Sequence, residues 1–234
     1  MKPANDPMID YKALVRVGYD RCVDRYNAMR AVESPSALDL LTERVRAGAS
    51  VLDIGCGAGT PITKSLANRF SVTGVDFSTQ QIRRARRDVP QADFIESDIM
   101  TVRFPSQSFD AVVAFFVLFH LPQRQQIELL ERVHTWLVAG GCLLATLSVF
   151  NEPPYIEDDF LGAPMYWTNF AEAEYHDLLR GLGYEILCMA TVRDGFSESC
   201  TGQNHRHPLV LAQKGGWVLR EEDRSADVSL RKGK

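Results

Sequence analysis

Residues 51–59 read VLDIGCGAG, a short apolar run that passes directly into three glycines, Gly55, Gly57 and Gly59. Glycines at a strand-to-helix turn adopt backbone conformations that a Cβ forbids, and they let a ligand approach the main chain closely. A second strand-like run, residues 72–75, ends at Asp76. A carboxylate at the tip of that strand can accept hydrogen bonds from both hydroxyls of a ribose. Together, the two features predict a nucleoside-bearing cofactor across the carboxyl ends of a parallel sheet.

The spacing of the glycines separates two classes of cofactor. Dinucleotide-dependent enzymes favour G-x-G-x-x-G, which places a pyrophosphate at a helix N-terminus. In this chain the third glycine comes one position earlier, and Thr60 and Pro61 open the predicted helix that follows. An isolated glycine triplet is also compatible with a tight turn that holds no ligand. The order of the remaining segments decides between these interpretations.

Strand-like and helical patterns alternate along the rest of the chain. The strands predicted after the second are residues 94–97, 109–116, 142–147, 184–192 and 207–214. The last two read as a closing antiparallel hairpin. Short strands that are separated by helices require a largely parallel, doubly wound sheet. Asp98 lies just beyond the third strand, and two phenylalanines, Phe115 and Phe116, stand at the tip of the fourth.

In this order and at these spacings, residues 50–148 resemble the class I S-adenosylmethionine-dependent methyltransferases of the small-molecule type. The resemblance extends over roughly residues 11–214, with one departure at Val138-Ala139, where the family usually has a basic residue and proline. It implies an α/β fold, a Rossmann-like doubly wound sheet of seven mostly parallel strands with a C-terminal antiparallel hairpin. It also implies S-adenosyl-L-methionine as the cofactor.

The expected organisation is one methyltransferase domain over residues 1–234. Its predicted parts are N-terminal lid helices (1–48), a cofactor-binding core (49–148), a substrate segment with the closing hairpin (149–214) and a polar tail (215–234). Residues 151–169 contain three prolines and several bulky aromatic side chains but show no clean period. We therefore expect an irregular segment there that holds substrate.

The resemblance also implies roles for individual residues around the cofactor. The glycine loop, which includes Cys56, would hold the methionine part. Asp53 would orient the loop and meet the amino group of the cofactor directly or through water. Asp76 would bind the ribose, while Phe115 would flank the sulfonium. The remaining implied contacts are Phe77, Asp98 and Ile99 around the adenine, and Tyr19 and Tyr26 of the lid over the carboxylate end.

Methyl transfer from a sulfonium is an in-line displacement that releases a neutral thioether, so the enzyme mainly positions the nucleophile and excludes water. A hydroxyl or ammonium acceptor also needs a base. His120, just past the fourth strand, is the candidate base, since a histidine has an unperturbed pKa of about 6.5. The alternative is a structural histidine that packs the turn before Pro122. The predicted substrate contacts are Phe116, Tyr166, Trp167 and His176.

Composition limits the partners of the protein. The chain has 234 residues and a formal net charge of −4, which argues against a dedicated nucleic-acid binder. It has no apolar run long enough to span a bilayer and no secretory signal at its N-terminus, and its five cysteines are an odd number. We therefore expect a cytoplasmic monomer or homodimer that acts on a small molecule, with neither a nucleic-acid nor a membrane partner.

Several alternatives remain open at this point. One is a protein that binds S-adenosylmethionine but catalyses a cyclisation or isomerisation, and another is a nicotinamide-dependent oxidoreductase, which the glycine spacing disfavours. The groups Cys200, His205, His207 and Glu157, Asp158, Asp159 resemble metal ligands. Solvated polar loops are the preferred interpretation of both groups, and no metal is expected.

Overall fold

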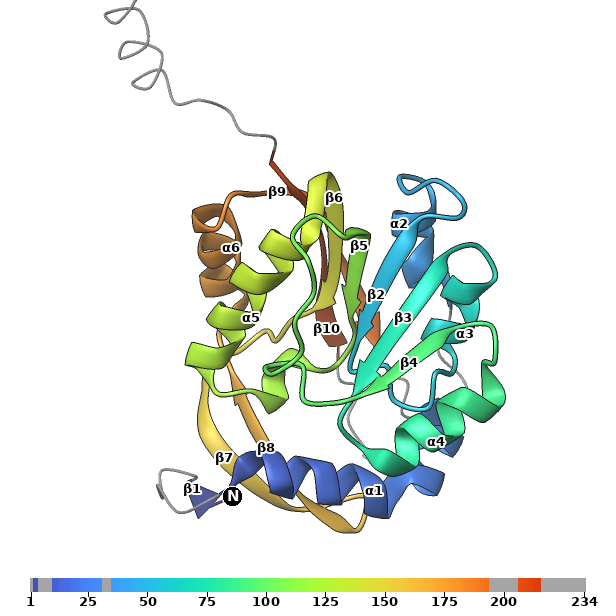
Figure 1. Ribbon diagram of the computed structural model, residues 1–234. Coiled ribbons are helices and arrows are strands. Elements are labelled where there is room, and N and C mark those ends of the chain that lie inside the picture. Colours follow the sequence, from blue (N-terminus) through green and yellow to red (C-terminus); the bar gives the residue numbers. More distant parts are fainter. Residues whose placement is uncertain (1, 4–9, 31–34, 194–205, 216–234) are drawn as a thin grey trace, which may run out of the picture.

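A computed structural model describes residues 2–3, 10–30, 35–193 and 206–215 of the chain. Its central feature is a seven-stranded sheet in which β10 and β9 form the antiparallel edge and the other five strands are parallel. In spatial order the strands are β4 (Asp93–Glu96), β3 (Ser71–Asp76), β2 (Ser50–Ile54), β5 (Phe109–Ala114), β6 (Leu137–Thr146), β10 (Arg206–Lys214) and β9 (Tyr184–Arg193). The predicted fold class is confirmed (Figure 1).

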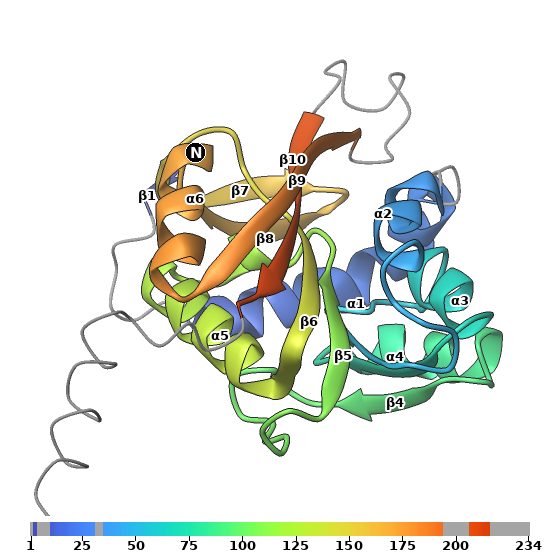
Figure 2. The ribbon, with the colours of Figure 1, turned by 90° about the horizontal axis from the view of Figure 1, so that it is seen from above.

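Helices cover both faces of this sheet (Figure 2). One face is covered by α5 (Gln123–Trp136) and α6 (Glu172–Gly181). The other is covered by η1 (Pro35–Leu38), α2 (Asp39–Thr42) and α3 (Ile62–Ala67), and α4 (Thr79–Asp88) lies beside β3 and β4. Successive side chains of β2 enter opposite layers, since Val51 packs in one apolar cluster and Leu52 in the other. Burial on both faces explains why the central strands read as continuous apolar runs.

Residues 151–169 are not irregular, so that part of the prediction was wrong. They form β7 (Glu152–Phe160) and β8 (Ala163–Asn169), an antiparallel hairpin that makes a second sheet with β1 (Lys2–Pro3). The ladder between β7 and β8 shifts register between Glu152 and Tyr155, where two prolines interrupt it. The prolines and the burial of neighbouring residues on both faces of β8 concealed the strand period in the sequence.

Several predicted boundaries also moved. The fourth strand ends at Ala114, before Phe115 and Phe116, because Phe116 takes a positive φ of 55° and turns the chain away. The fifth strand begins at Leu137 rather than at residue 142, and the helix expected from Thr60 begins at Ile62.

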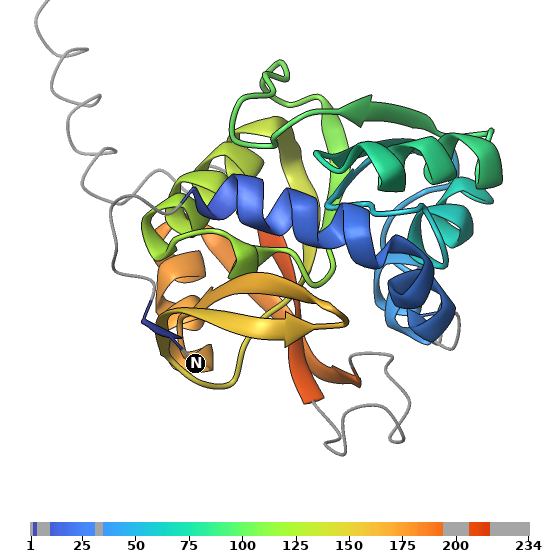
Figure 3. The same ribbon diagram turned by 90° about the horizontal axis from the view of Figure 1, so that it is seen from below.

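Helix α1 (Tyr11–Arg30) lies where the sequence predicted an amphipathic helix. It crosses the carboxyl ends of the parallel strands and packs on β8 (Figure 3). Met165 and Tyr166 of β8 are buried against Val15 of this helix. Polar contacts fix it to the core as well: the Ser78 hydroxyl donates to the Asp20 carboxylate at 2.6 Å, and Arg84 pairs with Asp24.

Candidate active site

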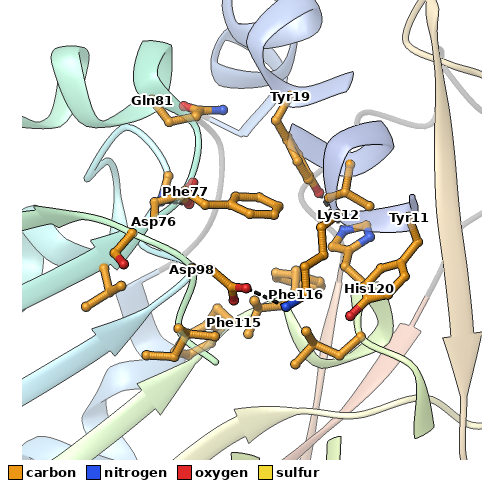
Figure 4. A pocket seen from close by; sticks show the side chains of 18 of the residues that line it. Tyr11, Lys12, Tyr19, Asp76, Phe77, Gln81, Asp98, Phe115, Phe116 and His120 are labelled. Carbon is orange, nitrogen blue, oxygen red and sulfur yellow. Dashed lines mark hydrogen bonds and ion pairs between the residues drawn. The ribbon is translucent and has the colours of Figure 1, made fainter. Parts of the chain in front are cut away.

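A cavity lies between α1 and the carboxyl ends of the parallel strands (Figure 4). It brings together most of the residues that the sequence singled out. The predicted residues that line it are Tyr19, Tyr26, Gly55, Gly57, Asp76, Phe77, Asp98, Ile99, Phe115, Phe116 and His120. Those that do not line it are Asp53, Cys56, Gly59, Tyr166, Trp167 and His176.

The glycine loop follows β2 and opens into this cavity. Gly55 and Gly57 have φ angles of +66° and +53°, in the left-handed region that favours glycine. A Cβ on Gly55 would lie 2.7 Å from the Cγ2 atom of Val117, so this glycine is required by packing. A Cβ on Gly57 would meet nothing closer than the Gln81 Oε1 atom at 3.9 Å. Gly57 is therefore the position where the backbone faces open space.

Asp76 ends β3 with both carboxylate oxygens directed by the backbone. One oxygen accepts the Gly57 N–H at 3.0 Å and the other accepts the Ser78 N–H at 2.8 Å. Burial raises the pKa of Asp76 to about 6, against the opposing effect of these two N–H groups. The carboxylate is held in one orientation and retains lone pairs for further donors.

Asp53, Cys56 and Gly59 lie behind the loop rather than on the cavity surface. The Asp53 carboxylate is buried and accepts the Thr63 hydroxyl at 2.6 Å, which ties β2 to α3. A Cβ on Gly59 would lie 3.0 Å from Val89 Cγ2, so this glycine serves the packing of α4. Burial raises the pKa of the Cys56 thiol well above its ordinary value. These three residues support the loop from behind and do not line the cavity.

Asp98 has a partner that the sequence did not indicate. Its carboxylate accepts the Met100 N–H at 2.9 Å and forms an ion pair with Lys12 of α1. Figure 4 shows the Lys12 side chain reaching into the cavity to this carboxylate. Nothing in the pattern of α1 distinguished Lys12 from a solvent-exposed lysine, because its partner lies on a distant part of the chain.

His120 lies in the short helix η2 (Leu118–His120), and both of its ring nitrogens have partners. Nδ1 lies 3.0 Å from the Tyr166 carbonyl oxygen and Nε2 lies 2.7 Å from the Tyr19 hydroxyl. Burial lowers the pKa of His120 to about 4, so the ring is neutral at neutral pH. The aromatic ring of Trp167 lies 4.5 Å from the imidazole, centroid to centroid.

The predicted substrate residues divide into three groups. Phe116 lines the cavity, and its N–H donates to the Thr146 hydroxyl at 2.6 Å. Tyr166 and Trp167 stand behind His120, which they position by a carbonyl group and by ring packing. His176 lies on α6, away from the cavity, and its buried Nε2 has no hydrogen-bond partner among the described residues.

Gln81 is a further cavity residue that sequence reasoning missed. Only 1% of it is exposed, and its Oε1 accepts the Asn27 amide of α1 at 3.3 Å. Its buried Nε2 has no hydrogen-bond partner in the part of the chain that is described. A buried donor without a partner is costly, so a ligand with an acceptor group is well suited to this wall.

No cluster of three histidine, cysteine or acidic residues suited to a metal ion occurs among the described residues. Of the residues considered as ligands, Cys200 and His205 lie outside the described residues. His207 instead packs edge-on against Phe116, with ring centroids 5.3 Å apart.

The fold and the cavity define a class of protein. A doubly wound sheet with a glycine loop after its first parallel strand and an acid at the tip of the next is a Rossmann-like domain with a site for a nucleoside. The family described as "Methyltransferase domain" matches residues 51–141, which include both features. This match, together with the relatives and the fold, supports a class I S-adenosylmethionine-dependent methyltransferase.

Curated proteins similar to this chain include a methyltransferase and a synthase. The chain is 40% identical over 123 residues to 27-O-demethylrifamycin SV methyltransferase of Amycolatopsis mediterranei (strain S699), covering 49% of this chain and 44% of that protein. It is 33% identical over 159 residues to carboxy-S-adenosyl-L-methionine synthase of Chromohalobacter salexigens, covering 63% of this chain and 54% of that protein. The chain thus spans about half the length of the curated relatives it matches.

Solved structures extend the likeness of the fold over most of the chain. The 1,6-didemethyltoxoflavin-N1-methyltransferase of Burkholderia thailandensis, solved with 1,6-didemethyltoxoflavin and S-adenosylhomocysteine, has a TM-score of 0.69 and 20% identity and covers 92% of this chain and 94% of that one. The [4+2]-cyclase SpnF has a TM-score of 0.65 and 18% identity and covers 85% of this chain and 95% of that one. At 18–20% identity, these structures show a similar fold and nothing further.

Proposed function

We propose that this protein is an S-adenosylmethionine-dependent methyltransferase that transfers a methyl group to an oxygen or nitrogen of a small molecule. The observation that carries the proposal is one cavity in which the glycine loop, two acids at strand tips and a histidine meet under a lid. Family membership and relatives that methylate small molecules support it.

The residues present suit S-adenosylmethionine. Gly57 presents its backbone to open space, and Gln81 holds a buried donor without a partner in the described part of the chain. In the proposed complex Asp76 accepts from the ribose hydroxyls, and Phe77 and Ile99 enclose the adenine. Asp98 accepts from the adenine amino group once Lys12 has moved aside. When bound, the cofactor supplies a methyl group on a sulfonium, which is already activated for displacement.

The protein's own contribution is then to orient the acceptor, to exclude water and to receive a proton. His120 suits the last task because burial keeps its ring neutral, and a neutral ring has a lone pair that can accept a proton. Phe115 and Phe116 stand beside the loop at the end of β5, where they would flank the methyl group and the acceptor.

The lining of the cavity favours a neutral acceptor with an apolar or planar surface. Among the described lining residues the only formal charges are Lys12, Asp76 and Asp98, and the proposed adenosine site uses both acids. The wall near His120 consists of Tyr19, Phe116 and uncharged neighbours. Such a lining suits an aromatic or otherwise apolar metabolite. The names of the rifamycin and toxoflavin methyltransferases support a role in natural-product metabolism.

The proposal also covers the domain organisation, the location and the oligomeric state of the protein. We propose a single domain with the four parts expected from the sequence, acting in the cytoplasm as a monomer or homodimer without nucleic acid. The net charge of −4 supports the last point. None of the described helices combines the length and the apolar character that crossing a membrane requires.

Two experiments test the function. Calorimetry compares binding of S-adenosylmethionine and S-adenosylhomocysteine with binding of nicotinamide dinucleotides, and tight dinucleotide binding alone would point to an oxidoreductase. A screen of candidate metabolites is then scored by mass. A gain of one methyl group in the acceptor is the expected result. Conversion without that gain would favour a cyclase or isomerase. This alternative is considered because the [4+2]-cyclase SpnF has a similar fold.

Asp76→Ala should lower the affinity for S-adenosylhomocysteine at least tenfold, since a hydrogen bond to a charged group is worth about 1.5–3 kcal/mol. The wild-type affinity should also fall as the pH drops below about 6, because the ribose hydroxyls favour the ionised carboxylate and its pKa is about 6. Calorimetry over a pH series measures both effects. Asp93→Ala, which removes an exposed acid from the far end of β4, is the control. An unchanged affinity in Asp76→Ala would mean that the ribose is bound elsewhere.

A further inference from the structure

The hydrogen bonds of His120 determine which of its nitrogens carries the proton. A carbonyl oxygen only accepts, so the 3.0 Å contact with the Tyr166 carbonyl requires a hydrogen on Nδ1. The neutral ring, which the lowered pKa favours, then has its lone pair on Nε2. The 2.7 Å contact at Nε2 is therefore a hydrogen bond that the Tyr19 hydroxyl donates. His120 lines the cavity, but its proton-accepting nitrogen is bound there to another side chain.

Tyr19 stands between this lone pair and the cavity. It comes from the lid helix α1, it lines the cavity together with Gly57 and Phe116, and Figure 4 shows it extending toward the imidazole. Its ring packs edge-on against His120 and Tyr26, with centroids 5.3 Å and 5.1 Å away. These contacts orient the phenol so that its hydrogen is directed at Nε2.

From this geometry we infer that Tyr19 is a catalytic residue that takes the proton of the acceptor and passes its own to His120. The inference rests on the proposed methyltransferase function and deepens it. As the acceptor oxygen or nitrogen bonds to the methyl carbon, the carbon–sulfur bond breaks and the thioether leaves neutral. The acceptor's proton moves to the Tyr19 oxygen while the Tyr19 proton moves to Nε2. His120 becomes the imidazolium and later releases its proton to solvent, so the net products are methylated acceptor, thioether and one proton.

The two halves of this relay belong to different parts of the structure. Tyr19 is carried by the lid, whereas His120 and its Tyr166 anchor belong to η2 and β8. The neighbouring Asp20 fixes this part of the lid, since its carboxylate accepts from both the Ser78 hydroxyl at 2.6 Å and the Gln80 N–H at 3.1 Å. The base is therefore complete only when the lid lies on the core, which is the state that excludes water from the reaction.

The first test compares Tyr19→Phe with Tyr11→Phe. Both variants remove a phenol oxygen of a cavity-lining residue of α1, and each loses a hydrogen bond to the core, since Tyr11 donates to Gln125 at 2.6 Å. Tyr11→Phe therefore measures the effect of weakening the lid. With the acceptor identified by the mass screen, Tyr19→Phe should lower kcat by about 10²-fold or more while the S-adenosylhomocysteine affinity changes by less than about threefold. A loss no greater than that of Tyr11→Phe would overturn the relay.

The second test needs no acceptor and uses the wild-type protein saturated with S-adenosylhomocysteine. Nitrogen-15 NMR of the imidazoles distinguishes the two neutral tautomers, and His120→Ala assigns the signal. The expected result is a His120 ring protonated at Nδ1 alone at neutral pH. A ring protonated at Nε2 would donate to Tyr19 and could not accept its proton, which would overturn the relay. Failure to bind S-adenosylhomocysteine would instead contradict the proposed function itself.

Discussion

Gly57→Val is expected to lower the affinity for S-adenosylhomocysteine by at least about a hundredfold, or about 2.7 kcal/mol. Two effects combine. The φ of +53° belongs to the left-handed region, where a β-branched residue is strained. The new side chain would also extend into the open space that the loop presents to the cavity, since no atom lies within 3.4 Å of the Gly57 Cβ position. Calorimetry with S-adenosylhomocysteine measures the loss.

Gly48→Val is the matched control for backbone strain. Gly48 has a φ of +76° and no neighbour within 4 Å of its Cβ position, and it lies outside the cavity lining. Both variants should lower the thermal unfolding temperature, but only Gly57→Val should lose the cofactor. If soluble, folded Gly57→Val bound S-adenosylhomocysteine normally, the loop would be a turn without a ligand.

His120→Ala is expected to lower turnover by roughly 10²–10⁴-fold with the cofactor affinity nearly intact. The base acts in its neutral form, so the wild-type kcat should rise as the pH passes upward through the pKa of His120. Burial shifts this rise in kcat from the ordinary histidine range to about pH 4, so kcat should be constant between about pH 6 and 8. The measurement is kcat at saturating cofactor over pH, because the ionisation of Asp76 affects binding in the same range.

His120→Asn separates proton transfer from positioning. Its side-chain amide retains a donor for the Tyr166 carbonyl but has no nitrogen that accepts a proton. It should therefore be as slow as His120→Ala. Near-normal turnover and an unchanged pH profile in either variant would end the assignment of His120 as the base and leave it as a packing residue of the turn before Pro122.

Local patterns were sufficient for the cofactor half of the site. Gly55, Gly57 and Asp76 belong to strands and turns whose identity depends on neighbouring residues, and parallel strands bring their carboxyl ends to one edge. Local patterns did not show that Asp53, Cys56 and Gly59 lie behind the loop, because whether a loop atom faces the cavity or the interior depends on which helix packs behind it. Here α3 and α4 occupy that side.

Residues 151–169 form strands whose stabilising partners lie elsewhere in the chain. The strands β7 and β8 are stabilised by pairing with each other and with β1 and by burial of Met165 under α1. The short stretch of sequence around Pro153 and Pro154 gives no indication of β1 or α1 as partners. Tertiary packing overrode the local preference for irregular structure.

By itself, the sequence determined the doubly wound sheet, the N-terminal amphipathic helix and the glycine loop with its acid, because each depends on residues close together in the chain or on the order of segments. Only the tertiary structure decided how the side chains that line the cavity are paired. Tyr19 and His120 are 101 positions apart, and Lys12 and Asp98 are 86 apart. Hydrogen bonds and ion pairs act over a few ångströms in space, so the proton-accepting nitrogen of His120 and the partner of Asp98 were fixed only when α1 packed across the strand ends.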